Sequence, residues 1–143
     1  MKILAVDLGK ARTGLAVCDE GEILASPVAV ITQYNREKLA QEVAAKAREL
    51  AVGELVVGLP RNMDGSEGES AQGAREFAAV LGELTGLPVV LRDERLTTVT
   101  AHGYLNDTNT RGKKRKAVVD AVAAVVILEE YLSFRRQQRA RES

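Results

Sequence analysis

Acidic residues end two apolar segments of this chain, and a third acidic residue interrupts an apolar helical pattern. Asp7 follows the apolar run at residues 3–6, and Asp93 and Glu94 come just after the apolar run at residues 87–91, separated from it by Arg92. Asp120 lies within residues 117–135, which are mostly alanine, valine, isoleucine and leucine. Carboxylates that converge repel one another unless a cation lies between them, and hard oxygen ligands suit Mg²⁺ or Mn²⁺. The pattern favours a metal site, and two ions are the usual arrangement for phosphodiester hydrolysis.

Asp120 is the most informative of these positions. At helical spacing it shares a stripe with Ala124, Ile127 and Tyr131, which indicates a buried face. A buried carboxylate costs several kcal/mol unless it has a partner such as an arginine, backbone donors or a metal ion. The structural alternative is an ion pair with one of three arginines, Arg12, Arg92 or Arg95.

Apolar periodicity and turn residues predict the elements that must position these side chains. Strands are expected at residues 2–6, 13–18, 22–31, 54–60 and 87–94, and helices at residues 36–51, 71–84, 97–105 and 117–135. A three-strand meander followed by crossover units gives an α/β fold, a five-stranded mixed sheet with helices on both faces. Sites on such sheets lie beyond the carboxyl ends of the parallel strands.

Basic residues gather near the end of a chain whose formal net charge is zero. Residues 111–141 contain nine basic and three acidic side chains. Residues 106–116 are expected to form a polar loop whose cations would contact backbone phosphates: Arg111, Lys113, Lys114, Arg115 and Lys116. Residues 135–143 are expected to be a flexible basic tail. The alternative for both segments is a solvated loop and a frayed end.

Composition narrows the class of protein. The 143 residues suffice for one domain, expected at residues 1–134, and no apolar run approaches the roughly 20 residues that span a bilayer. No signal-peptide pattern is present, so a cytoplasmic protein is expected. A single cysteine and a single histidine argue against a disulfide framework and a zinc site.

Two other functions share parts of the pattern. A strand ending in Asp7-x-Gly9, with Gly14 after the turn, also occurs in sugar kinases, actins and chaperone ATPases, where the turn binds nucleotide phosphates. Those proteins close two domains over the nucleotide, and 143 residues leave no room for the second. A non-catalytic RNA-binding module would need only the basic segment, and it would leave Asp120 without a purpose.

Four motifs in this order resemble the YqgF/RuvX family of bacterial ribonuclease H-like nucleases. They are VDLGKARTG from residue 6, VVGLPRNMDG from residue 56, DERLTT from residue 93 and KKRKAVVDAVAAVVILEEYL ending at residue 132. The resemblance covers residues 2–134 and shows no departure at the motif positions. It implies a ribonuclease H-like fold and a metal-dependent hydrolase that cleaves phosphodiester bonds.

The resemblance also implies site residues and substrates. Asp7, Glu94 and Asp120 would be the metal-binding catalytic carboxylates, with Mg²⁺ or Mn²⁺ as cofactor. Asp93 would assist or cap the following turn, and Arg12 and Arg95 would touch the scissile phosphate or pair with the acidic cluster. The loop at residues 58–65 would form part of the cleft rim. The family is described both as trimming the 5′ end of precursor 16S ribosomal RNA and as resolving Holliday junctions. Structured RNA or branched DNA is therefore the expected partner of a monomer or homodimer, and no membrane is involved.

Overall fold

The computed structural model describes residues 1–96 and 112–142, and for residue 96 and residues 112–121 it describes the backbone alone. Five strands form one sheet in the order β3-β2-β1-β4-β5. They span Ile3–Asp7 (β1), Arg12–Cys18 (β2), Ala25–Thr32 (β3), Glu54–Leu59 (β4) and Val89–Asp93 (β5). β1, β2 and β3 pair antiparallel, whereas β4 pairs parallel with both β1 and β5. The predicted mixed sheet, a meander followed by parallel strands, is confirmed.

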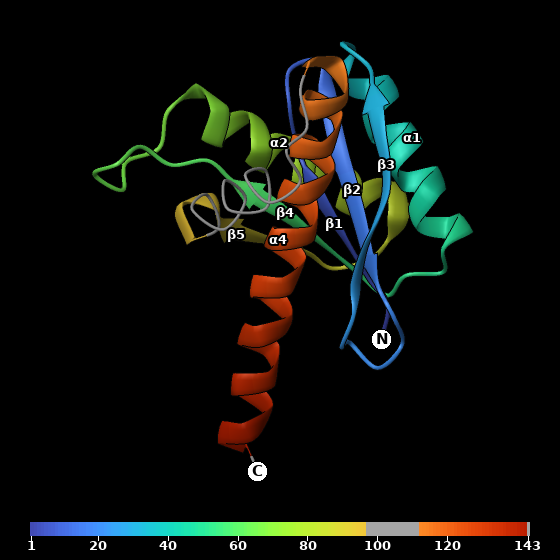
Figure 1. Cartoon of the computed structure of the whole chain (residues 1–143), viewed down its shortest axis with the longest axis vertical. Coiled ribbons are helices and arrows are strands. Elements are labelled where there is room, and N and C mark those ends of the chain that lie inside the picture. The colour runs from blue at the N-terminus through green and yellow to red at the C-terminus, as the bar shows by residue number, and fades with distance from the viewer. Residues whose placement is uncertain (97–111, 143) are drawn as a thin grey trace.

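Helices cover both faces of this sheet, as the sequence predicts (Figure 1). α1 (Arg36–Glu49) and α2 (Glu69–Thr85) lie on one face, and α4 (Gly112–Glu142) crosses the other. The side chain of Asn35 caps α1 by accepting a hydrogen bond from the backbone of Lys38 at 3.0 Å. α2 ends at Gly86, whose left-handed backbone suits glycine. Within the described residues, no helix is long and apolar enough to cross a membrane.

Strand alternation divides the core into two layers and decides which side chains can meet α4. Leu4 and Val6 of β1 pack against α1 and α2, whereas Ile3 and Ala5 pack against α4. Successive side chains of a strand point to opposite faces, so Asp7 belongs to the face that α4 covers. The apolar part of β1 is completely buried, and it carries Asp7 to the carboxyl edge of the sheet.

The boundaries of the last helix differ from the prediction at both ends. α4 begins at Gly112, so Lys113–Lys116 lie in its first turns rather than in a loop. It continues to Glu142 instead of ending near Arg135, so residues 135–142 are helical where a flexible tail was predicted. Arginine, glutamine, alanine and glutamate are all good helix formers, and charge density alone was mistaken for a lack of structure. The short helix predicted at residues 97–105 lies outside the described residues.

Candidate active site

Two of the predicted carboxylates meet at the carboxyl edge of the sheet. Asp7 is the last residue of β1, and Glu94 opens the short 3₁₀ helix η1 (Glu94–Leu96) directly after β5. A side-chain hydrogen bond joins Glu94 to Asp7. Such a bond between two carboxyl groups needs a proton on one of them, because two carboxylates repel each other. The arrangement is therefore suited to binding a proton or a cation.

Gly58 makes this meeting possible, because β4 lies between β1 and β5. In the register of the sheet, Gly58 pairs with Arg92 and directly follows Val57, the partner of Val6. A Cβ atom added at Gly58 would lie 2.5 Å from Oε1 of Glu94 and 2.9 Å from its Cγ. The side chain of Glu94 therefore lies across β4 in the space that glycine leaves open.

Burial changes the protonation of Glu94. Loss of solvent is the largest influence and raises the pKa of Glu94 above its ordinary value. The hydrogen bond with the Asp7 side chain lowers the pKa of Glu94 in part, and the negative charge of Asp93 raises it further. A bound cation would favour ionisation of a carboxyl group whose charged form burial disfavours.

The third predicted carboxylate, Asp120, belongs to α4, and its side chain lies outside the description. The direction of the helix is fixed by its later residues. Ile127 lies near Gly58 at the end of β4, and Tyr131 donates a hydrogen bond to Glu54 at the start of β4. α4 therefore runs antiparallel to β4. Asp120 precedes Ile127 by two helical turns, so its backbone lies on the same helix face about 10 Å further along the axis. This displacement is toward the carboxyl edge of the sheet.

Two of the three arginines considered as structural partners of Asp120 bind other carboxylates. Arg92 forms an ion pair with Glu130, with Nε 2.9 Å from Oε2. The guanidinium of Arg95 pairs with Asp93 at 2.7 Å. The third, Arg12, is the first residue of β2 and is half-buried. Its predicted contact with the scissile phosphate is not tested by the structure.

Asp93 and Glu94 are neighbours in the chain, but their side chains make different contacts. Asp93 accepts a hydrogen bond from the backbone N–H of Arg95 at 2.9 Å and so caps η1. The Arg95 side chain holds the pKa of Asp93 below its usual range. This is the capping role that the sequence offered as one alternative for Asp93. Among the side chains that the structure describes, no three acidic, histidine or cysteine groups are close enough to hold a metal ion.

The glycine turn between β1 and β2 is tightly packed. A Cβ atom at Gly9 would overlap the carbonyl oxygen of Arg12. The backbone N–H of Gly9 lies 3.4 Å from the hydroxyl oxygen of the buried Thr13. Close approach of the backbone therefore requires glycine at this position, immediately after Asp7.

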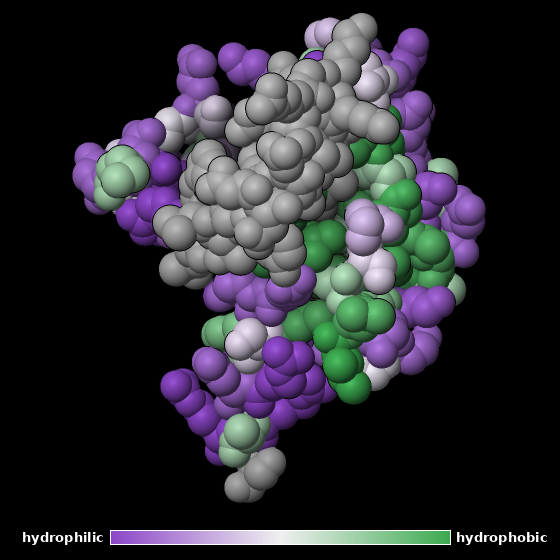
Figure 2. All heavy atoms as spheres, viewed as in Figure 1, coloured by the Kyte–Doolittle hydropathy of each residue, from purple (hydrophilic) through white to green (hydrophobic). Residues whose placement is uncertain are grey.

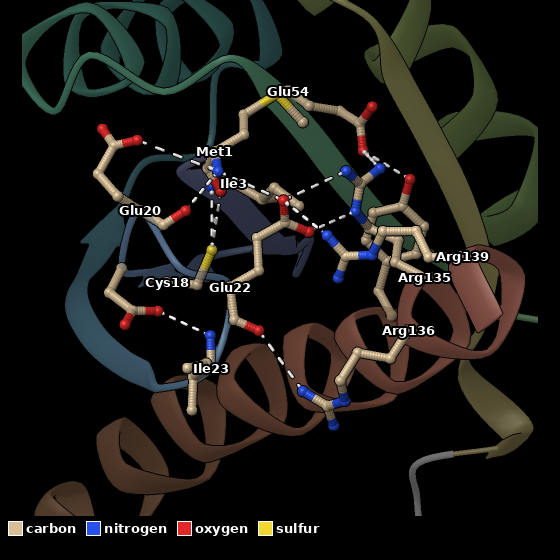
Figure 3. Close-up of polar contacts among 12 residues, drawn as sticks. Met1, Ile3, Cys18, Glu20, Glu22, Ile23, Glu54, Arg135, Arg136 and Arg139 are labelled. Atoms are coloured by element: carbon tan, nitrogen blue, oxygen red, sulfur yellow. Dashed lines mark hydrogen bonds and ion pairs between the residues drawn. The ribbon is translucent and has the colours of Figure 1, made fainter. Parts of the chain in front are cut away.

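A second cluster, which sequence reasoning missed, lies at the opposite edge of the sheet (Figure 3). Glu22 and Glu54 are buried, and Arg135 of α4 bonds to both, at 2.6 Å and 3.5 Å. Tyr131 donates to Glu54 at 2.5 Å, and Arg139 lies 3.6 Å from Glu22. The available signal was the i, i+4 spacing of Tyr131 and Arg135 together with a glutamate opening the apolar strand β4.

A family model described as RuvX, Holliday junction resolvase, matches residues 1–134. A protein from Anaeromyxobacter sp. (strain Fw109-5), named "Putative pre-16S rRNA nuclease", is 47% identical over 94% of this chain and 98% of its own. A protein of the same name from Lachnospira eligens is 42% identical over 96% of this chain and 100% of its own.

Solved structures show the same fold at low sequence identity. Thermus thermophilus RuvC in complex with a Holliday junction has a TM-score of 0.63 at 13% identity and covers 96% of each chain. The fowlpox virus Holliday junction resolvase has a TM-score of 0.54 at 13% identity, over 93% of this chain and 99% of its own. These likenesses confirm the ribonuclease H-like fold. The family match over residues 1–134 and the relatives at 42% and 47% identity show that the chain belongs to the RuvX family of nucleases.

Proposed function

We propose that this nuclease processes the 5′ end of precursor 16S ribosomal RNA, using divalent metal ions held by Asp7, Glu94 and Asp120. The observation that carries the metal site is the hydrogen-bonded pair of Asp7 and Glu94 at the carboxyl edge of the sheet. The proposed substrate is the one in the names of relatives that are 38–47% identical to this chain.

The donor set fits Mg²⁺ or Mn²⁺. Carboxylate oxygens are the ligands that these ions prefer, and a bound cation would favour the ionised form of Glu94, whose pKa burial raises. When bound, the metal would polarise a phosphoryl oxygen and supply a hydroxide nucleophile at neutral pH. The residues of this chain would hold the ions at the sheet edge, and two ions would accommodate both the attacking and the leaving oxygen.

The first turns of α4 would guide the nucleic acid. The backbone of Lys113–Lys116 lies at the start of the helix that also carries Asp120, four to seven residues earlier. We propose that these cations and Arg111 contact backbone phosphates, which position a nucleic acid without reading its sequence. Arg12 would contact the scissile phosphate, because β2 begins beside the strand end that carries Asp7.

Holliday junction cleavage is the second candidate, because the matching family model is described by that activity. Purified protein should be incubated with a precursor 16S rRNA fragment and with a synthetic four-way DNA junction, each with Mg²⁺, Mn²⁺ or EDTA. Cuts near the mature 5′ end of the RNA support the proposal. Paired symmetrical cuts in the junction alone would replace it with the second candidate.

The same assay tests the site residues. We expect Asp7→Asn, Glu94→Gln and Asp120→Asn each to abolish cleavage while the melting temperature stays near that of the wild type. Loss of one charge from a cluster of carboxylates relieves repulsion in the metal-free protein. Glu20→Gln is the matched control, because Glu20 is exposed at the opposite edge of the sheet. An active, folded Asp120→Asn variant would refute the three-carboxylate site.

A further inference from the structure

Met63 is the most exposed of the large apolar side chains that the structure describes, with 95% of its surface accessible. It belongs to the arm, residues 60–68, which connects β4 to α2. The arm projects from the body of the protein beside β4 and β5 (Figure 1). Figure 2 shows that the surface at the end of this projection is mostly hydrophilic around a small apolar spot. Single exposed apolar side chains are common on protein surfaces, so the position at which the arm holds Met63 decides whether this side chain can take part in binding.

The arm is held in one shape by its own hydrogen bonds. The backbone N–H of Asn62 donates to the carbonyl of Ser66 at 2.9 Å, and the N–H of Gly65 donates to the carbonyl of Asn62 at 2.9 Å. Ser66 donates its hydroxyl to Asp64 at 2.6 Å. Gly65 has a φ of +88°, which suits glycine in a closed turn. The side chain of Asp64 therefore points toward Ser66 and has a structural role within the arm.

The base of the arm is fixed to α2. Glu67 accepts two hydrogen bonds of 2.7 Å from the guanidinium of Arg75, and it pairs with Arg61 at 3.5 Å. Bidentate arginine pairs hold a defined geometry. The backbone position of Met63 is therefore set by contacts within the chain, which lowers the entropy cost of placing its side chain on a ligand.

Arg95 connects the arm to the candidate active site. Its Nη1 lies 3.5 Å from the carbonyl oxygen of Met63, and its Nε and Nη2 bond to Asp93. Glu94 is the residue between Asp93 and Arg95 in the chain, and it opens η1. One guanidinium thus joins the backbone of Met63 to the turn that carries a proposed metal ligand.

We propose that Met63 packs against a nucleobase next to the scissile phosphate and thereby determines which phosphodiester bond is cut. This inference rests on the proposed nuclease site at Asp7 and Glu94. Apolar side chains, including methionine, act as wedges between bases, and the thioether is flexible and polarisable. A single apolar side chain with polar neighbours is too small for a stable protein interface. A base face beside the reacting phosphate is a surface of the right size and polarity.

The test compares Met63→Ser, Met63→Leu and the wild type on whichever of the two substrates the wild type cuts. Removing an aromatic side chain that stacks on a base weakens binding by roughly tenfold or more, and we take about tenfold as the expected loss of cleavage rate for a methionine contact. We expect Met63→Ser to show this loss and to spread the cuts over neighbouring bonds, whereas Met63→Leu retains the rate and the position. Leu24→Ser is the control, because Leu24 is 66% exposed in the hairpin at the opposite edge of the sheet.

A binding measurement separates this inference from the proposed function. 2-Aminopurine placed beside the cut site, or at the junction centre, reports unstacking by its fluorescence when the Glu94→Gln protein binds with Mg²⁺. Met63→Ser in that background should abolish the fluorescence change. If the wild type cuts neither substrate, the proposed function fails, and this measurement still decides the role of Met63. Unchanged cut positions, rates or fluorescence in Met63→Ser would overturn the inference.

Discussion

Buried carboxyl groups have opposite kinds of partner at the two edges of the sheet, which are the edge where β1 and β4 begin and the edge where they end. At the edge where β1 and β4 begin, Glu22 and Glu54 are bonded to Arg135, and Tyr131 supplies a further donor. At the edge where these strands end, Glu94 is bonded to another carboxyl group, that of Asp7. The first arrangement neutralises its charges within the chain. In the second arrangement two acidic groups share a hydrogen bond, which a proton or a bound cation would stabilise.

α4 links the two edges. Its residues Tyr131 and Arg135 bond at the beginning of β4, and its earlier residues Ala124 and Ile127 pack on the strands toward their ends. An α-helix is stiff over this distance, so contacts near Arg135 fix the position of Asp120 about 22 Å away along the axis. The paired cluster thus supports the geometry of the proposed metal site.

The largest expected effect comes from breaking the paired edge. Arg135→Leu removes the cation shared by Glu22 and Glu54 and leaves two buried carboxylates without it. We expect the free energy of unfolding to fall by about 3 kcal/mol, as for other broken buried pairs. Denaturant unfolding measures the loss. Arg141→Leu is the control in the exposed part of the same helix and should change stability by less than about 0.5 kcal/mol. Equal losses in the two variants would show that the cluster does not anchor α4.

A smaller loss of stability, with a large loss of activity, is expected from Gly58→Ala. The added methyl group would lie 2.5 Å from Oε1 of Glu94 and 2.9 Å from Cδ1 of Ile127. Overpacking of this kind costs about 1–3 kcal/mol, and here it also displaces a proposed metal ligand. Cleavage should therefore be nearly lost in a protein that still folds. Gly73→Ala is the control, because a Cβ atom there meets nothing within 4 Å. Full activity in Gly58→Ala would show that the position of Glu94 over β4 is not needed.

The sheet, and the end of the sheet at which Asp7, Asp93 and Glu94 lie, could be predicted because their signals are local. Short apolar runs ending in Asp7, and in Asp93 and Glu94, fix both the strands and the edge to which the acids belong. Which of the two side chains, Asp93 or Glu94, crosses β4 toward Asp7 depends on residues that are distant in the sequence. Asp93 caps η1, and Glu94 crosses β4 only because Gly58, some 35 residues earlier, leaves room for it.

Long-range pairs explain the remaining errors. No pattern near Glu22 indicates that Arg135, more than a hundred residues later, will bond to it, and without that bond the arginine-rich end resembles a loose tail. Arg95 pairs with the acidic residue Asp93, which was one of its two expected roles, but its additional reach to the carbonyl of Met63 depends on how the arm folds back. Such contacts emerge only when distant segments pack together.

The smallest expected effect is in the pH dependence of stability, where the two edges should act with opposite signs. Hydrogen bonding to Arg135 lowers the pKa of Glu22 from its ordinary value of 4.5. The stability that Glu22 contributes is therefore present above about pH 4.5 and is lost as the pH falls through its lower folded pKa. Burial raises the pKa of Glu94 above 4.5, so its contribution is present below that pH and is lost as the pH rises through the folded pKa. The free energy of unfolding should be measured with denaturant, in EDTA, at pH values below and above 4.5. We expect Glu22→Gln to reduce the loss of stability at acidic pH. We expect Glu94→Gln to reduce the loss of stability as the pH rises above 4.5. Mg²⁺ should also remove that decline in the wild type, because a bound cation replaces the proton. A decline that persists unchanged in Glu94→Gln would mean that the carboxyl edge tolerates its charges without a ligand, and the contrast between the two edges would fail.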